Sequence, residues 1–261
     1  MIDPVQLIAL ALIQGLTEFL PISSSGHLIL LPAFFGWRDQ GLAFDIAVHL
    51  GTLAAVVVYF RRDLAAMARS LTMPATAQAQ LFWRLVAATV PFGLAGLAFA
   101  DYVEPLLRSP AIIAATSAGF GVLLWAADRR RRGARDEHSL GWLEAMLIGG
   151  SQALALIPGT SRSGITMTVA LALGLSREAA GRFSFLLAIP AISMAVVWQL
   201  AQFAASGASV PWLPLALAVL VSGAVAFATI ALFLKLIGRV GMGAFAVYRV
   251  ALAGVIVYVL L

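Results

Sequence analysis

Residues 14–30 read "QGLTEFLPISSSGHLIL", and this stretch places reactive side chains inside an apolar segment. It holds a carboxylate (Glu18), a proline (Pro21), three consecutive serines at 23–25, a glycine and His27. Proline, glycine and hydroxyl residues end one helix and cap the next. The stretch therefore predicts two short half-helices joined by a polar tip, in place of one continuous helix across residues 3–36.

A second break of the same kind occurs in the other half of the chain. The sequence "PGTSRSG" at 158–164 interrupts an apolar region that covers 141–175. Corresponding glutamines stand nine residues before corresponding serines, Gln14 before Ser23 and Gln152 before Ser161. Similar apolar segments, "FDIAVHLGTLAAVVVYF" and "FSFLLAIPAISMAVVWQL", follow at nearly the same distance from each break. The shared polar spacing indicates an internal repeat.

The composition predicts an all-α integral membrane protein. Of 261 residues, 62% are hydrophobic and 11% are charged. Crossing the hydrocarbon core takes about 20 residues of helix, and six apolar runs are long enough. Their approximate cores are 43–60, 82–100, 110–127, 180–201, 212–236 and 243–261. The chain has no cysteine, which excludes disulfides and cysteine-ligated metals, and its start lacks the basic flank of a cleavable signal peptide.

The repeat predicts one membrane domain over 1–261 that is built from two inverted halves. Repeat 1 covers about 1–127, a loop covers 128–140, and repeat 2 covers about 141–261. Each half contains one re-entrant broken hairpin and three transmembrane helices. An odd number of crossings inverts the second half relative to the first, and such paired halves place their sites near the middle of the membrane.

The basic residues predict the orientation of the chain. The net charge is +5, but the basic residues gather in short loops, which indicates membrane orientation and not nucleic-acid binding. The stretches 61–84 and 128–138 are arginine-rich, and Lys235 and Arg239 lie between the last two spans. We expect these three regions to be cytoplasmic. The loops 101–109 and 202–211 and both termini are then outside.

Three ionisable residues in the two breaks are the first candidates for function: Glu18, His27 and Arg162. Irregular backbone and charge inside a membrane are tolerated where they line a protein cavity, and they mark functional sites. The two tips would present helix N-termini, which bind phosphate groups, and Arg162 adds a planar fork that matches phosphate oxygens. Glu18 can bind a divalent cation or act as a base, and His27 can act as nucleophile, base or acid.

"QGLTEFLPISSSGHL" together with "PGTSRSG" resembles the undecaprenyl-diphosphate phosphatase family, the bacitracin-resistance type. The similarity extends over nearly the whole chain, including "FDIAVHLGT", "FSFLLAIP" and the terminal "AVYRVALAG". The resemblance implies an enzyme of the bacterial inner membrane that removes the terminal phosphate of undecaprenyl diphosphate and so recycles the lipid carrier for cell-wall synthesis. It also implies Mg²⁺ or Ca²⁺, an active site toward the outer face and contact with membrane lipid, and it leaves a homodimer open.

The resemblance assigns roles residue by residue. It implies catalytic roles for Glu18, Ser24, His27 and Arg162. Gln14 and Glu18 match the family's metal motif, although the amide of Gln14 carries no charge. The remaining tip residues are expected to bind substrate beside Arg162: Ser23, Ser25, Gly26, Thr160, Ser161 and Ser163. The sequence leaves open whether His27 or Ser24 attacks phosphorus, and it favours His27 because a serine needs an adjacent base.

Two other functions compete with this interpretation. Type-2 phosphatidic acid phosphatases also use "SGH" and "SR" elements, but they need a histidine downstream of the arginine, and no histidine follows Arg162. An inverted-repeat lipid or ion transporter without hydrolase activity has the same architecture, and fold alone does not decide function. His, Ser, Glu and Arg at one point favour hydrolysis.

Polar residues outside the breaks have weaker interpretations. Asp45 and His49 lie four residues apart on one face of the first span, where they either line the cavity or bond each other. Arg249 in the last span is expected to pack or to bond carbonyl groups.

Overall fold

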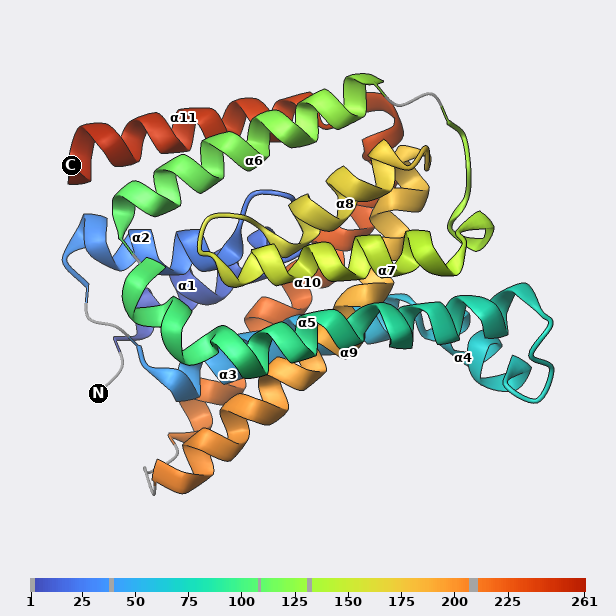
Figure 1. Ribbon diagram of the computed structural model, residues 1–261. Helices are drawn as coiled ribbons and strands as arrows, with labels where there is room; N and C mark the ends of the chain where they lie inside the picture. Colours follow the sequence, from blue (N-terminus) through green and yellow to red (C-terminus); the bar gives the residue numbers. More distant parts are fainter. Residues whose placement is uncertain (1–2, 38–39, 108, 131–132, 207–210) are drawn as a thin grey trace.

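The computed structural model describes residues 3–37, 40–107, 109–130, 133–206 and 211–261, and it is a bundle of helices (Figure 1). The six helices long and apolar enough to cross a membrane are α3 (Leu42–Tyr59), α5 (Ala77–Leu107), α6 (Pro110–Arg130), α9 (Arg177–Ser206), α10 (Trp212–Val240) and α11 (Gly243–Leu260). They confirm the six predicted spans. The described residues form no β-strand, only an isolated bridge between Arg135 and Leu175.

The first apolar region is broken as the sequence predicts. Its helices are α1 (Pro4–Thr17) and α2 (Ser24–Phe35). Asp3 caps α1 by accepting a hydrogen bond of 2.8 Å from the N–H of Val5. The 14 residues of α1 extend about 21 Å at the usual rise per residue, which is less than the roughly 30 Å thickness of a hydrocarbon core. Neither helix can cross a membrane alone.

The second apolar region is broken in the same way. It contains α7 (Trp142–Ser151), the 3₁₀ helix η2 (Gln152–Leu156) and α8 (Arg162–Ala172). In Figure 1, the start of α1 and the end of α2 lie toward the end of the bundle that holds both chain termini. Helices α7 and α8 extend from the opposite end. The two polar tips meet in the middle of the bundle. This opposed arrangement is compatible with two inverted halves.

Packing partners also correspond between the halves. Helix α1 packs against α10, and its counterpart α7 packs against α5. The last helices of the two halves, α6 and α11, pack against each other. The contact between α3 and α10 is close because Gly51 has no side chain: a Cβ there would lie 2.1 Å from Ser222 Oγ. The repeat boundaries themselves stay a prediction.

Basic residues gather at the bundle end opposite the termini, and many of them are paired. Arg177 at the start of α9 binds both carboxylate oxygens of Asp128 at the end of α6. Arg182 bonds Glu137 in the 3₁₀ helix η1 (Glu137–Ser139) and Asp63. Glu144 accepts two hydrogen bonds from Arg135 and a third from the N–H of Gly141. These bonds lower the pKa of its carboxyl group to about 2. These pairs fix the connection between the two halves.

The structure corrects the predicted connections in two places. The stretch 61–84 is not a loop, because it contains helix α4 (Arg61–Ser70) and the first turns of α5. Met67 is the buried residue of α4, and its arginines face outward. The outer loops predicted at 101–109 and 202–211 are shorter, since α5 continues to Leu107 and α9 to Ser206. Arg131 and Arg132 of the predicted basic loop, and residues 108 and 207–210, lie outside the described residues.

Candidate active site

Each polar tip is built around a serine that caps a half-helix. Ser23 precedes α2 with φ 72°, and Ser161 precedes α8 with φ 70°. Among the described residues they are the only two outside glycine with positive φ, a conformation that L-residues rarely adopt. Ser23 Oγ accepts from the N–H of Gly26 at 3.4 Å, and Ser161 Oγ accepts from the N–H of Gly164 at 3.1 Å. The pattern Ser-x-x-Gly therefore has the same local structure in both halves.

The tips touch each other, as the sequence predicts. Ser163 Oγ of the second tip donates to the backbone carbonyl of Leu20 in the first, at 2.9 Å. Arg162 Nη2 donates to Glu18 Oε1 at 3.2 Å, and both side chains are largely buried. The starts of α2 and α8 leave the N–H groups of their first turns without helical partners. Two positive helix ends thus meet at one point, which favours a negatively charged ligand.

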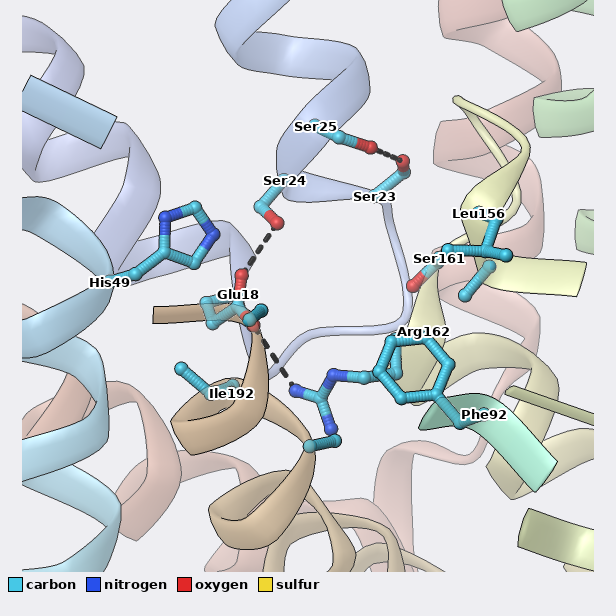
Figure 2. A pocket seen from close by; sticks show the side chains of 13 residues that line it. Glu18, Ser23, Ser24, Ser25, His49, Phe92, Leu156, Ser161, Arg162 and Ile192 are labelled. Atoms are coloured by element: carbon cyan, nitrogen blue, oxygen red, sulfur yellow. Dashed lines mark hydrogen bonds and ion pairs between the residues drawn. The ribbon is translucent and has the colours of Figure 1, made fainter. Parts of the chain in front are cut away.

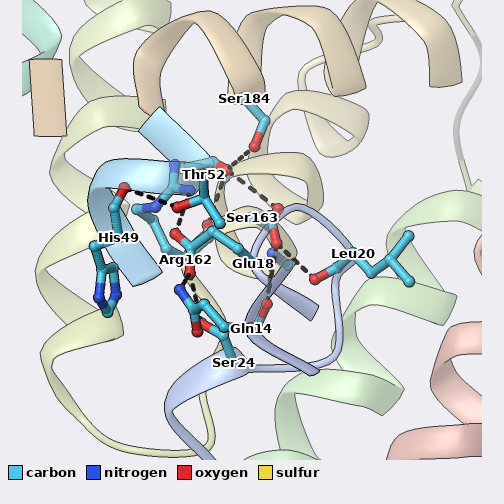
Figure 3. Close-up of polar contacts among 12 residues, drawn as sticks. Gln14, Glu18, Leu20, Ser24, His49, Thr52, Arg162, Ser163 and Ser184 are labelled. Carbon is cyan, nitrogen blue, oxygen red and sulfur yellow. Dashed lines mark hydrogen bonds and ion pairs between the residues drawn. The ribbon is translucent and has the colours of Figure 1, made fainter. Parts of the chain in front are cut away.

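Glu18 is the centre of the polar contacts (Figure 3). The residue is 8% exposed, and its carboxylate accepts three side-chain hydrogen bonds. Ser24 Oγ donates to Oε2 at 2.6 Å, Gln14 Nε2 donates to the same oxygen at 3.0 Å, and Arg162 donates to Oε1. A short bond between a hydroxyl and a carboxylate is the arrangement of a nucleophile with its base.

A cavity of about 160 Å³ lies where the tips meet, and Figure 2 shows the side chains around it. Its polar lining comes from Glu18, Ser23, Ser24, Ser25, His49, Ser161 and Arg162. Its apolar lining includes Phe92, Leu156 and Ile192. Polar, charged and apolar side chains therefore line the same cavity. That combination suits a phosphorylated head group attached to a lipid.

A second cavity, of about 280 Å³, adjoins the first and shares Ser25 and His49 with it. Asp45 and Gln199 add polar side chains, and residues of α2 complete the wall. Asp45 lies near the start of α3, and Gln199 lies in the last turns of α9. The start of α3 and the end of α9 lie toward the end of the bundle that holds the chain termini (Figure 1).

Some of the predicted site residues do not line the first cavity. Gln14, Gly26, Thr160 and Ser163 are buried behind it. His27 also points elsewhere: its Nδ1 donates to the carbonyl of Ser23 at 2.7 Å, and its Nε2 accepts from Tyr248 Oη at 2.6 Å. A carbonyl can only accept, so the proton lies on Nδ1, and both ring nitrogens are engaged. His27 therefore does not line the first cavity, whereas Ser24 does.

His49, in contrast, faces the cavity. Its Nδ1 donates to the backbone carbonyl of Asp45 at 2.7 Å, which leaves Nε2 for a ligand. The spacing of Asp45 and His49 left two alternatives open, and both side chains line the second cavity while His49 also bonds the backbone of Asp45. Sequence reasoning missed Phe92 and Tyr248. Nothing distinguishes Phe92 from other apolar residues of its helix, and the only signal for Tyr248 is its position beside Arg249.

The donor set at Glu18 can be compared with the needs of a divalent cation. The described residues contain no group of three or more His, Cys, Asp or Glu side chains that could hold a metal. However, Gln14 Oε1 is buried without a hydrogen-bond partner, one helical turn from Glu18. Mg²⁺ commonly takes only one or two carboxylates from the protein and completes its shell with phosphate oxygens and water. One carboxylate and one free amide oxygen fit that mode.

Comparisons with known proteins agree over almost the whole chain. Residues 7–255 match the family described as "Bacitracin resistance protein BacA". The chain is 51% identical to "Undecaprenyl-diphosphatase 2" of Stutzerimonas stutzeri, with 97% of each chain covered. It is 51% identical to "Undecaprenyl-diphosphatase" of Nitrosococcus oceani, with 98% of each covered. A protein of the same name from Marinobacter nauticus is 49% identical, over 99% of this chain and 100% of that one.

Proposed function

The chain belongs to the BacA family of bacitracin resistance proteins, and we propose that it hydrolyses undecaprenyl diphosphate to undecaprenyl phosphate and inorganic phosphate. It is a multi-pass membrane enzyme that returns the lipid carrier to cell-wall synthesis. The observation that carries the proposal is the contact of Ser24 and Arg162 with the one carboxylate of Glu18, where two helix N-termini meet. Positioned donors of this kind stabilise the charge of a phosphoryl group in transfer.

In the proposed mechanism, Ser24 is the nucleophile and Glu18 is its base. Ser24 Oγ bonds to the terminal phosphorus while Glu18 takes the hydroxyl proton, a transfer that the 2.6 Å contact supports. The bond from the terminal phosphorus to the bridging oxygen breaks, and the lipid leaves as its monophosphate, to which Glu18 passes the proton. Water then attacks the phosphoserine, and Glu18 carries a proton from that water to the departing Ser24 oxygen. Phosphate is released and both side chains are regenerated.

Arg162 and the two tips bind the diphosphate in this mechanism. Arg162 Nη1 is buried without a partner, so it can donate to a phosphate oxygen while Nη2 stays on Glu18. The N–H groups at the starts of α2 and α8 face the same charge. Ser23, Ser25 and Ser161 add hydroxyls around it. In this account His27 stabilises the first tip through Ser23 and Tyr248 and does not attack phosphorus.

We also propose that Glu18 and Gln14 hold the Mg²⁺ or Ca²⁺ that the resemblance implies. When bound, such a cation offsets negative charge on the diphosphate. The support is the unpartnered Gln14 Oε1 beside the carboxylate. A homodimer stays a prediction of the resemblance.

A transporter without hydrolase activity is the alternative, and phosphate release separates the two. Purified protein should release inorganic phosphate from undecaprenyl diphosphate in the presence of Mg²⁺ or Ca²⁺. Glu18→Gln should reduce the rate at least about 100-fold, because it removes the base and its charge, while the melting temperature stays close to that of the parent. A parent protein that binds the lipid but releases no phosphate would favour the transporter, and a fully active Glu18→Gln would remove Glu18 from the mechanism.

The role of Arg162 is tested by a substitution that keeps its charge. Arg162→Lys replaces the planar guanidinium by an ammonium group. The lysine cannot donate from two fixed nitrogens to Glu18 and to a phosphate oxygen together. The expected result is a fall in kcat/KM of about 100-fold, in line with the loss of one charge-stabilising donor, measured by phosphate release. Arg129→Lys at the cytoplasmic end is the control and should have parental activity. Parental turnover in Arg162→Lys would show that the fork is not used.

The charge distribution supports a site that opens outward, with both termini outside. Because the chain has no cysteine, single cysteines can be labelled without background. An impermeant thiol reagent added to intact cells should label Ala205→Cys and Leu261→Cys. Ala66→Cys and Ala134→Cys should react only after the membrane is opened. The reverse pattern would overturn this orientation.

A further inference from the structure

Arg249 is a fully buried arginine in α11 whose partners are all backbone carbonyls. Its exposed fraction is 0%, and none of the ion pairs between described side chains includes it. A buried charge is costly unless its donors are satisfied. Nε donates to Ser117 O at 2.9 Å and Nη2 to Thr116 O at 3.3 Å, both in α6. The other bonds go to the polar tips.

The guanidinium joins the two tips from behind the cavity. Nη1 donates to Pro21 O in the first tip at 3.2 Å, and Nη2 donates to Gly159 O and Thr160 O in the second tip, each at 2.9 Å. These carbonyls stand one or two residues before the capping serines. The N–H groups after the same serines open the half-helices that face the cavity. Arg249 itself does not line the cavity.

The neighbouring structure leaves room for the guanidinium and little else. A Cβ on Gly164 would lie 2.8 Å from Arg249 Nη1, and one on Gly121 would lie 3.0 Å from Arg249 Cβ. The planar fork and its donors match several carbonyls at once, which an ammonium group cannot do from one position. Without these donors, three carbonyl dipoles from two separate segments would point at one another with no partner.

A smaller contact repeats this arrangement in the other half. Thr116 Oγ1 in α6 lies 2.7 Å from Pro158 O in the second tip, the shortest of its contacts with carbonyl oxygens; Ile112 O of its own helix lies at 2.8 Å. Pro21 and Pro158 are the corresponding prolines of the two breaks. Hence the last helix of the second half, α11, bonds the first tip through Arg249. The last helix of the first half, α6, contacts the second tip through Thr116. Arg249 bonds the second tip as well.

We propose that Arg249 is a positioning residue for the phosphatase site: it sets the distance between the two tips, and through it the placement of Arg162 against Glu18 and Ser24. The inference rests on the proposed function for its effect on catalysis, but the distance between the tips can be measured without it. A misplacement of about 1 Å at a reacting centre can cost about 100-fold in rate. Replacing the guanidinium of Arg249 should therefore lower kcat far more than it raises KM.

The first test measures the distance. Leu16 in α1 and Leu154 in η2 are exposed, at 48% and 42%, and stand before the two tips. Spin labels on Leu16→Cys and Leu154→Cys should give a narrow distance distribution in the parent, and a broader or longer one with Arg249→Lys. An unchanged distribution would overturn the proposal. Because this measurement needs no turnover, it holds even if the protein proves not to be a phosphatase.

The second test uses the coupling between residues. Arg249→Lys should lower kcat about 100-fold in the parent, but less than about 5-fold in an Arg162→Lys background, where the placement of the fork is already lost. A merely structural role would reduce activity by the same factor in both backgrounds, and that result would contradict the proposal.

A third variant keeps the test valid if Arg249→Lys fails to fold. Thr116→Val preserves shape and removes the donor to Pro158 O, so it should broaden the distance distribution and reduce kcat about 5-fold or more. Thr89→Val is the control, because Thr89 is a buried threonine whose hydroxyl bonds Leu85 O of its own helix and contacts neither tip. The proposal predicts parental distance and kcat for Thr89→Val. Equal behaviour of the two threonine variants would overturn it.

Discussion

A backbone that leaves its helix inside a membrane has to find new hydrogen-bond partners, because lipid offers none. This chain interrupts two apolar regions at the middle of the bundle, and each interruption exposes carbonyls on one side of a capping serine and N–H groups on the other. The tips solve the problem jointly. Their carbonyls turn to the guanidinium of Arg249, and Ser163 reaches the carbonyl of Leu20. Their N–H groups are left to face a cavity.

The chemistry of the site follows from that division. Two helix starts converge on one small volume, and their dipoles favour an anion there. The carboxylate of Glu18 is stable in this place because Ser24, Gln14 and Arg162 all donate to it. A diphosphate would meet the free donor of Arg162, the hydroxyls of the tips and a serine already bonded to a base. Apolar side chains in the lining, such as Phe92 and Leu156, suit the lipid part of such a substrate.

The sequence predicts the parts of this structure that depend on composition and spacing. The six spans, both breaks and the meeting of the two polar tips follow from apolar runs, helix punctuation and the repeated glutamine-to-serine interval. Helix α4 was missed because its hydrophobic face contains little more than Met67. The direction of His27 could not be predicted, since the rotation of α2 about its axis decides whether that side chain faces the cavity or Tyr248. The rotation of α3 about its own axis likewise decides that His49 faces the cavity. Such angles depend on helix packing, which spacing along the chain does not determine.

The central claim is that the two tips make one hydrolytic site in which Ser24 carries the phosphoryl group. The most direct test is to mix the purified protein with undecaprenyl diphosphate that is labelled on its terminal phosphate, stop one portion rapidly in acid and another in an alkaline denaturant, and map the label in both portions by mass spectrometry. The account predicts an acid-stable phosphoserine at position 24, which is absent when Ser24 is replaced by alanine. A label on His27, stable in base and lost in acid, would contradict it.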